Sequence, residues 1–221
     1  MESLAKELFN SARDVMSGLT DKRKSSNALR YKMETVGMAG LSVFFMQEPS
    51  FLQHQQKLQQ SKETNNYTNL FGGDESIPTD NHIRNLLDEV SFSELEAIYD
   101  KGLQVLQKHN GLKQFEFLEG YMISLDGTAY HSSKNIFCEQ CKRTTHGDKT
   151  TYTHGLLATA LVTPGIKEAI ALVPEFITPQ DGQSKQDCEN AAVKRWLNKH
   201  AQHYTDLKPI YLGDEIGRAH V

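Results

Sequence analysis

The sequence predicts a two-part α+β chain, in which an N-terminal helical domain is followed by an α/β domain. Apolar residues recur at helical spacing through the first half. After Gly111 they give way to short apolar runs that are bounded by turn residues. The change falls near residues 111–116. We therefore expect a helical domain over residues 1–112 and an α/β domain over residues 113–214.

The helices of the first half are predicted from capping residues and from one clear apolar face. Thr79 or Asp80 is the expected N-cap of one helix, and Ser93-Glu94-Leu95-Glu96 has the capping-box pattern of the next. Residues 53–69 are rich in polar side chains and predict a solvated helix that runs into a loop. The face before Pro49 consists of Val36, Ala39, Gly40, Val43 and Phe44.

The second half predicts the element order β-β-β-α-β. Strands are expected at residues 114–125, 151–162, 168–177 and 209–213, with a helix at 184–204 between the third and fourth. The first three strands are expected to form an antiparallel meander, and the crossover helix then adds the fourth strand, so that a parallel pair lies at the centre of the sheet. The first and fourth strands are the candidates for this parallel pair.

Two aspartates follow the first and fourth strands, and they are the leading candidates for catalysis. Asp126 lies in Ser-Leu-Asp-Gly-Thr, and Asp214 lies in Leu-Gly-Asp. Parallel neighbouring strands would bring both carboxylates to one sheet edge, where they would suit Mg²⁺ or Mn²⁺. Two such ions ~3.5–4 Å apart can activate an attacking oxygen and stabilise the leaving oxygen of a phosphodiester. The competing interpretation is that each aspartate belongs to an ordinary turn.

A second set of candidate ligands lies between the first two predicted strands. Cys138-x2-Cys141 is followed by His146 and His154, which together match the ligands of a tetrahedral zinc site. The spacing differs from that of a standard zinc finger, and a reduced, idle cysteine pair is the alternative. His131 is a further candidate ligand.

The bulk properties are those of a globular protein with no membrane segment. The chain is 38% hydrophobic and 24% charged, and no run approaches the ~20 apolar residues of a membrane span. A cytoplasmic location is expected. The net charge of -4 argues against a protein that coats nucleic acid. Six cations against two acids between Arg13 and Lys32 predict either a solvated loop or a segment that contacts phosphates.

Several strings of the sequence resemble DDE transposases of bacterial insertion sequences, which have a ribonuclease H-like catalytic domain. They are most similar to one unclassified insertion-sequence group, and the resemblance covers roughly residues 15–214. The strings around Asp126 and Asp214 belong to this resemblance. The others are Phe44 to Phe51, Ile77 to Arg84, Pro174 to Ile177, Gln186 to Glu189 and Lys194 to Leu197.

The resemblance implies a magnesium-dependent enzyme that cleaves and joins double-stranded DNA at the ends of a mobile element. It implies a homo-oligomer when full-length, located in the bacterial cytoplasm with the nucleoid, and a DNA-binding role for residues 1–112. Asp126 and Asp214 would be the first two acidic ligands, and a glutamate on a later helix would be the third. Residues 215–221 depart from the family's pattern. We expect them to be a non-native tail on an inactive N-terminal fragment with a partial ribonuclease H-like domain.

Two other functions stay open from the residues. One is a non-catalytic, zinc-containing DNA-binding module, in which the cysteines and histidines matter and the aspartates do not. The other is a stand-alone two-metal nuclease, whose third acid would be a nearby residue such as Glu175.

Overall fold

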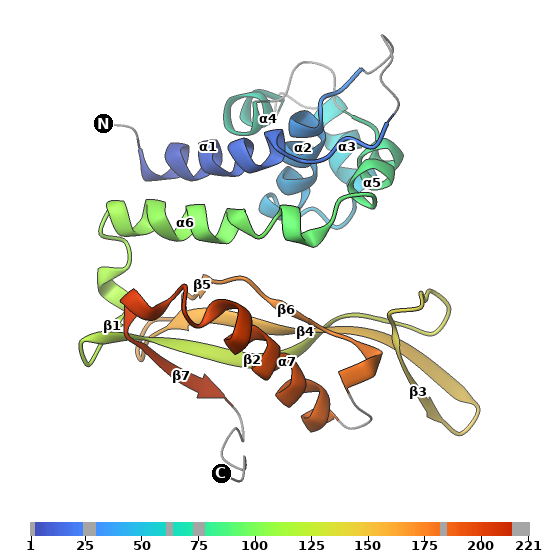
Figure 1. Cartoon of the computed structure of the whole chain (residues 1–221). Helices are drawn as coiled ribbons and strands as arrows, with labels where there is room; N and C mark the ends of the chain where they lie inside the picture. Colours follow the sequence, from blue (N-terminus) through green and yellow to red (C-terminus); the bar gives the residue numbers. More distant parts are fainter. Residues whose placement is uncertain (1–2, 24–29, 61–63, 73–77, 182–184, 214–221) are drawn as a thin grey trace. The chain divides into compact units, whose positions relative to one another are not determined.

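The computed structural model describes residues 3–23, 30–60, 64–72, 78–181 and 185–213, and it divides the chain into two compact units (Figure 1). The first unit spans Met1–Asn110 and the second Gly111–Val221. In the described residues, the first unit is helical and the second contains the strands. The predicted α+β organisation is therefore confirmed, and each unit is treated by itself below.

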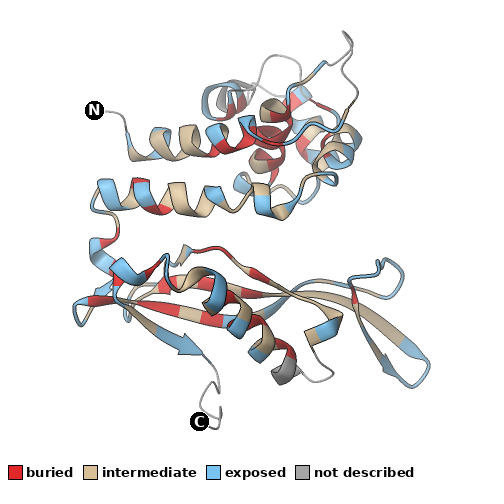
Figure 2. Ribbon diagram, viewed as in Figure 1, coloured by how far each residue is buried: buried red, intermediate tan, exposed pale blue. Residues whose placement is uncertain are grey.

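The first unit is a group of helices around the α2 helix. Val36, Met38 and Ala39 of α2 are at most 1% exposed, and side chains of α1, α3, α4 and α5 complete this core (Figure 2). The helices are α1 (Leu4–Ser17), α2 (Met33–Phe45), α3 (Phe51–Gln60), α4 (Thr64–Phe71), α5 (Asp80–Leu87) and α6 (Ala97–Lys108), with a 3-10 turn at Phe92–Glu94 before α6.

Two features of this unit differ from the sequence-based expectation. Residues 53–60 belong to α3 and residues 64–69 to α4, so a second helix lies where a loop was expected, and Leu58 and Tyr67 are buried among the polar residues. The capping box is formed by Ser91 and Glu94, two residues before the predicted one, and it caps the 3-10 turn. The prediction of Thr79 as an N-cap is confirmed, since its hydroxyl accepts from the backbone N–H of His82.

The second unit is built on a sheet whose two long central strands, β2 and β4, run antiparallel (Figure 1). The short strand β7 pairs with β2 in parallel, as predicted, from Tyr121↔Pro209 to Leu125↔Gly213. Strands β3, β5 and β6 pair with β4. The elements are β1 (Glu116–Phe117), β2 (Gly120–Ser133), β3 (Lys142–His146), β4 (Lys149–Val162), β5 (Ile170–Ala171), β6 (Glu175–Ile177), α7 (Lys185–His200) and β7 (Pro209–Gly213), with 3-10 turns at Lys113–Phe115, Pro179–Asp181 and Thr205–Leu207.

Three strands differ from their predicted forms. Strand β2 continues to Ser133, so Asp126 lies inside a strand and not at its end. The predicted third strand is split into β5 and β6, because Pro174 has no N–H to donate to a ladder. Strand β3 was not predicted, since its residues are polar and show no apolar alternation.

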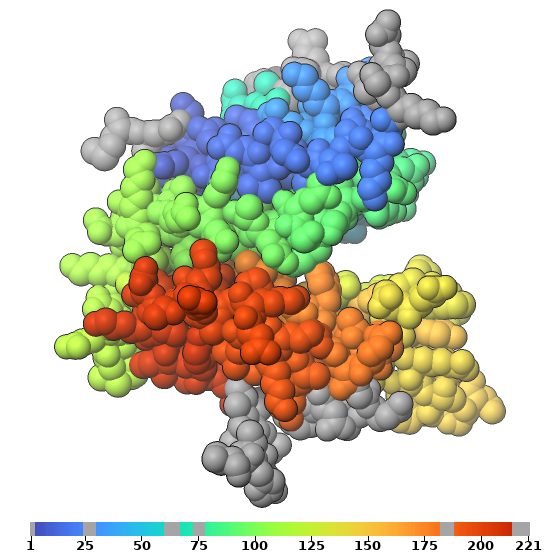
Figure 3. All heavy atoms as spheres, viewed as in Figure 1, coloured from blue at the N-terminus to red at the C-terminus, as the bar shows by residue number. Residues whose placement is uncertain are grey.

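Helix α7 covers one face of the sheet. It contacts β2, β4 and β6, and its Ala192 and Trp196 are 0% exposed. The strand residues Ile123, Leu157 and Leu161 are at most 1% exposed. In the space-filling view, the side chains around α7 form a continuous surface, and the β3–β4 hairpin projects at one end in yellow (Figure 3).

Candidate carboxylate edge and metal centre

Asp126 faces away from α7. A Cβ built on its neighbour Gly127 would collide with the carboxylate of Glu189 on α7, so position 127 faces that helix. Successive residues of a strand point to opposite faces. Asp126 therefore lies on the other face of the sheet, and its side chain is exposed.

An open hollow of about 450 Å³ adjoins Asp126 at the end of the parallel β2–β7 pairing. The last pair of that ladder is Leu125↔Gly213, so Asp126 follows it directly. Asp214, the second predicted acidic ligand, lies outside the described residues. Among the described residues, Asp126 belongs to no cluster of three or more possible metal ligands. The hollow is lined by Ser124, Leu125, Asp126, Tyr211, Leu212 and Gly213.

Glu175 lies on the face of the sheet opposite to Asp126. It pairs with Leu157, which pairs in turn with Gly127, and residues paired in this way point to the same face. Its carboxylate accepts from Arg195 Nε at 2.9 Å and from Lys199 Nζ at 2.8 Å. The stand-alone nuclease completed by Glu175 is therefore not supported, because the two carboxylates cannot share ions across the sheet.

The cations of α7 near Glu175 are paired with acidic groups of the same unit. Arg195 also donates to both carboxylate oxygens of Asp181 and to the carbonyl oxygen of Phe176. Burial raises the pKa of Asp181, but the hydrogen bonds and charge of Arg195 outweigh it, so the pKa is lowered overall. These contacts make Arg195 and Lys199 parts of an internal ion network.

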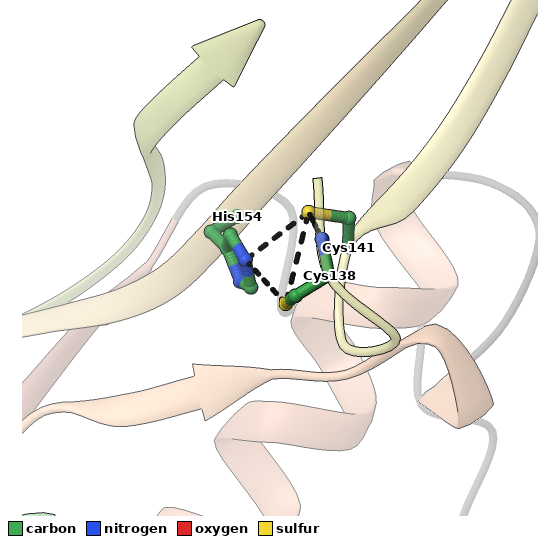
Figure 4. A group of neighbouring side chains, drawn as sticks. All are labelled: Cys138, Cys141 and His154. Carbon is green, nitrogen blue, oxygen red and sulfur yellow. Dashed lines mark hydrogen bonds between the residues drawn. The ribbon is translucent and has the colours of Figure 1, made fainter. Parts of the chain in front are cut away.

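Three of the four predicted zinc ligands lie together (Figure 4). The sulfurs of Cys138 and Cys141 are 4.0 Å apart, and His154 Nε2 is 3.2 Å from the first and 3.1 Å from the second. A tight turn sets up the pair, since the backbone N–H of Cys138 donates to Cys141 Sγ and that of Cys141 to the Cys138 carbonyl. The two cysteines precede β3, and His154 comes from β4.

The structure does not bring His146 to this group. His146 ends β3 and pairs with Lys149 beside the hairpin turn, whereas Cys141 immediately precedes the other end of β3. Along β4, position 149 is five residues from His154, which corresponds to about 17 Å. The hairpin therefore separates His146 from the other three predicted ligands.

Tyr130 is a neighbour of the group that the sequence did not reveal. Its ring stacks on that of His154, with centroids 5.6 Å apart and an interplanar angle of 27°. Burial and the electrostatic interaction with Cys138 and Cys141 raise the pKa of its hydroxyl. Tyr130 lies in a β-bulge between Ala129 and His131, and the sequence carries no clear signal for it.

The Cys138–Cys141–His154 group and Asp126 lie on the same face of the sheet. Asp126 pairs with Ala158 of β4, and His154 is four residues before Ala158 in the same strand. An even number of residues along a strand restores the same face, and four residues span about 14 Å. The two predicted centres therefore share one surface of the second unit.

Three of the five described cations of the basic segment in the first unit make ion pairs, and the guanidinium of a fourth, Arg30, lies 5.3 Å from the ring centroid of Tyr31. Arg13 lies 3.6 Å from Glu34, Lys22 lies 3.5 Å from Glu89, and Arg23 lies 2.7 Å from Asp21. Lys24 falls outside the described residues. For Arg13, Lys22 and Arg23, these ion pairs favour the solvated-surface interpretation over direct phosphate contact.

Comparison with protein-family models, curated proteins and solved structures gives no match for this chain. Among the helices within the described ranges, none combines the length and the apolar character needed to span a bilayer.

Proposed function

We propose that this chain is part of a DDE transposase of a bacterial insertion sequence, and that its second unit belongs to a ribonuclease H-like catalytic domain. The full-length protein would cleave and join double-stranded DNA by two-metal phosphoryl transfer. The sheet order β6-β4-β2-β7, with α7 between β6 and β7 in the chain, supports this proposal. It is the arrangement that the resemblance in sequence implies.

The observation that carries the proposal is the register of the β2–β7 ladder. It ends at Leu125↔Gly213, and Asp126 and Asp214 follow these two residues in the sequence. One further step in the same register would set the two aspartates side by side. Two neighbouring carboxylates repel each other unless a cation lies between them. The register thus favours a shared divalent ion at the hollow.

In this proposal, Asp126 is the first acidic ligand and Asp214 the second. Mg²⁺ or Mn²⁺ would supply the charge stabilisation that phosphodiester chemistry needs. Asp126 offers an exposed carboxylate at the open hollow, and the ladder pairs Gly213, which precedes Asp214 in the sequence, with Leu125, which precedes Asp126. The third acid of the resemblance, a glutamate on a later helix, has no assigned residue in this chain.

The test is cleavage of the element's ends by the full reading frame, with Asp126→Asn compared with wild type. A metal ligand contributes several kcal/mol in the transition state, so we expect a rate loss of about a thousandfold or more. Asp148→Asn is the matched control, because Asp148 is an exposed acid in the β3–β4 turn. Undiminished magnesium-dependent cleavage by Asp126→Asn would refute the assignment.

A second function is favoured by the Cys138–Cys141–His154 group. We infer that it binds Zn²⁺ as a structural ion. A tetrahedral zinc with Zn–S near 2.3 Å and Zn–N near 2.05 Å sets its sulfurs about 3.8 Å apart and sulfur from nitrogen about 3.6 Å. The observed 4.0, 3.2 and 3.1 Å are close to these values. In this proposal, the zinc ion of the DNA-binding-module hypothesis would lie in the same unit as Asp126.

Metal analysis of the chain purified under reducing conditions tests the zinc site. We expect about one zinc per chain, and we expect Cys138→Ser and Cys141→Ser to lose it. Cys188→Ala is the matched control, because Cys188 is not in the three-residue group. A wild-type chain that stays free of zinc after incubation with excess zinc would contradict the inference.

A further inference from the structure

The three-residue group leaves one position of a tetrahedral ion open. Structural zinc sites are almost always closed by four protein ligands. Resting on the zinc site proposed above, we propose that His131 of β2 is the fourth ligand. The ion would then join β2, the segment before β3, and β4.

The first support is the position of His131 across from His154. The two residues are paired in the β2–β4 ladder, and their ring centroids are 5.8 Å apart. Two imidazoles bound to one tetrahedral zinc have centroids about 5.2 Å apart, given a Zn–N distance of 2.0–2.1 Å. The observed separation of the centroids is about 0.6 Å longer than this value.

The second support is the β-bulge. Ala129 pairs with Gly155, so in a regular ladder the next pair would be Tyr130 and His154. The register shift between Ala129 and His131 inserts Tyr130 as an extra residue and gives His131 the place opposite His154. Bulges of this kind re-aim side chains beside functional sites. Here the bulge sets His131 opposite the metal-ligating histidine and leaves Tyr130 to stack on it.

The present partner of His131 does not oppose this role. His131 Nε2 lies 3.4 Å from the carbonyl oxygen of Ile136, which is long for a hydrogen bond. His131 is not in the group of ligand atoms that lie within 4.8 Å of one another. Binding of the ion therefore requires the His131 ring to turn from Ile136 toward the two sulfurs.

The other nearby candidates fit less well. Glu139 lies between the two cysteines in sequence and is exposed, and it is absent from the three-residue group among the described residues. His146 is at the far end of β3, beside the hairpin turn. Neither is paired with His154 in a ladder. His131 alone among these three is held in register with a residue of the group.

Zinc affinity, measured by competition with a chromophoric chelator, tests the proposal on the full chain. Outer-shell partners of a zinc site already change affinity by 10–100-fold, so we expect His131→Gln to weaken binding by about 100-fold or more. His131→Cys supplies a ligand of the same class and is expected to restore most of the affinity. His146→Gln is the matched control and is expected to bind as wild type does.

Cobalt substitution gives a second reading on the same variants. We expect wild type to show the visible bands of tetrahedral Co²⁺. These bands are expected to change in His131→Gln, and in His131→Cys to move toward those of a site with three sulfur ligands.

Equal affinity and an unchanged cobalt spectrum in His131→Gln would overturn His131 as a ligand and leave the three-residue site standing. Folded His131→Gln and His131→Cys chains that bind equally weakly would also overturn it. Cys138→Ser, measured alongside, shows the signal of a chain without the zinc site. A wild-type chain that gives the same signal as Cys138→Ser with both metals would overturn both proposals.

Discussion

Replacing Trp196 by alanine is expected to lower the free energy of unfolding of the second unit by about 3–5 kcal/mol, the range for deleting a buried aromatic side chain. Trp196 is 0% exposed and stacks on Tyr204, with ring centroids 5.7 Å apart. Its Nε1–H donates to the carbonyl oxygen of Val173 at 2.6 Å. Alanine removes the ring from the α7 interface and leaves a cavity, so both packing and the hydrogen bond are lost.

Urea unfolding followed by circular dichroism measures this loss, because Trp196 is the only tryptophan and its fluorescence disappears with the substitution. Trp196→Phe is the matched variant. It keeps an aromatic ring and loses the N–H donor, so its cost is expected to be clearly smaller than that of alanine. A loss below about 1 kcal/mol for Trp196→Ala would show that α7 does not depend on this ring.

Replacing Arg195 by alanine is expected to cost about 2–3 kcal/mol. The guanidinium is bound to Glu175 and Asp181, whose side chains are 11% and 6% exposed, so its removal leaves two carboxylates without their main partner. Breaking a fully buried pair in this way costs 3–5 kcal/mol. The side chain of Arg195 is 33% exposed, and screening by solvent reduces the expected value.

The pH dependence of stability gives an independent check on the Arg195 network. The pKa of Asp181 is lowered in the folded state from its ordinary value of 3.8. A depressed folded pKa stabilises the protein above the unfolded pKa, and this stabilisation is lost as the pH falls through the folded value. We expect Arg195→Ala to lose less stability than wild type on acidification below about pH 4. An acid dependence identical to that of wild type would contradict this role.

Two variants control the Arg195 experiment. Lys194→Ala changes an exposed cation on the same helix and is expected to stay within about 0.5 kcal/mol of wild type. Arg195→Met combined with Glu175→Gln and Asp181→Asn removes the guanidinium together with both carboxylates that it binds, and leaves Lys199 as the remaining charge. Replacing a whole buried network is often nearly neutral, so this triple variant is expected to recover part of the loss.

The second unit was predicted from its sequence more completely than the first. The bounds of β7 at Pro209–Gly213 match the predicted strand, and α7 falls within the predicted helix. The parallel pairing of β7 with β2 agrees with the crossover helix that the sequence predicts before the last strand. In the first unit, the burial of Leu58 and Tyr67 depends on packing between helices, and local polar composition gave no sign of it.

For the zinc site, the sequence spacing indicated the kinds of ligand, but it did not indicate which of the predicted ligands lie together. Cys138 and Cys141 lie three residues apart, so one turn brings them together, and His154 joins them through the sheet. His146 follows the cysteines closely in sequence, but it lies at the far end of the unpredicted strand β3, away from the other three predicted ligands. The bulge at Tyr130 depends on the register between two strands that are far apart in sequence, so no local pattern indicated it.

Between β5 and β6, the carbonyl group of Val173 accepts two hydrogen bonds that come from different elements of the unit. The carbonyl oxygen of Val173 accepts from Thr159 Oγ1 at 2.8 Å as well as from the indole of Trp196. Thr159 belongs to β4 and Trp196 to α7, so a single acceptor fastens the sheet and the helix at one point. Pro174, which interrupts the strand, follows this carbonyl directly. The interruption in the ladder thus serves as an anchor: movement of α7 along the sheet would have to break a contact that also fixes a central strand.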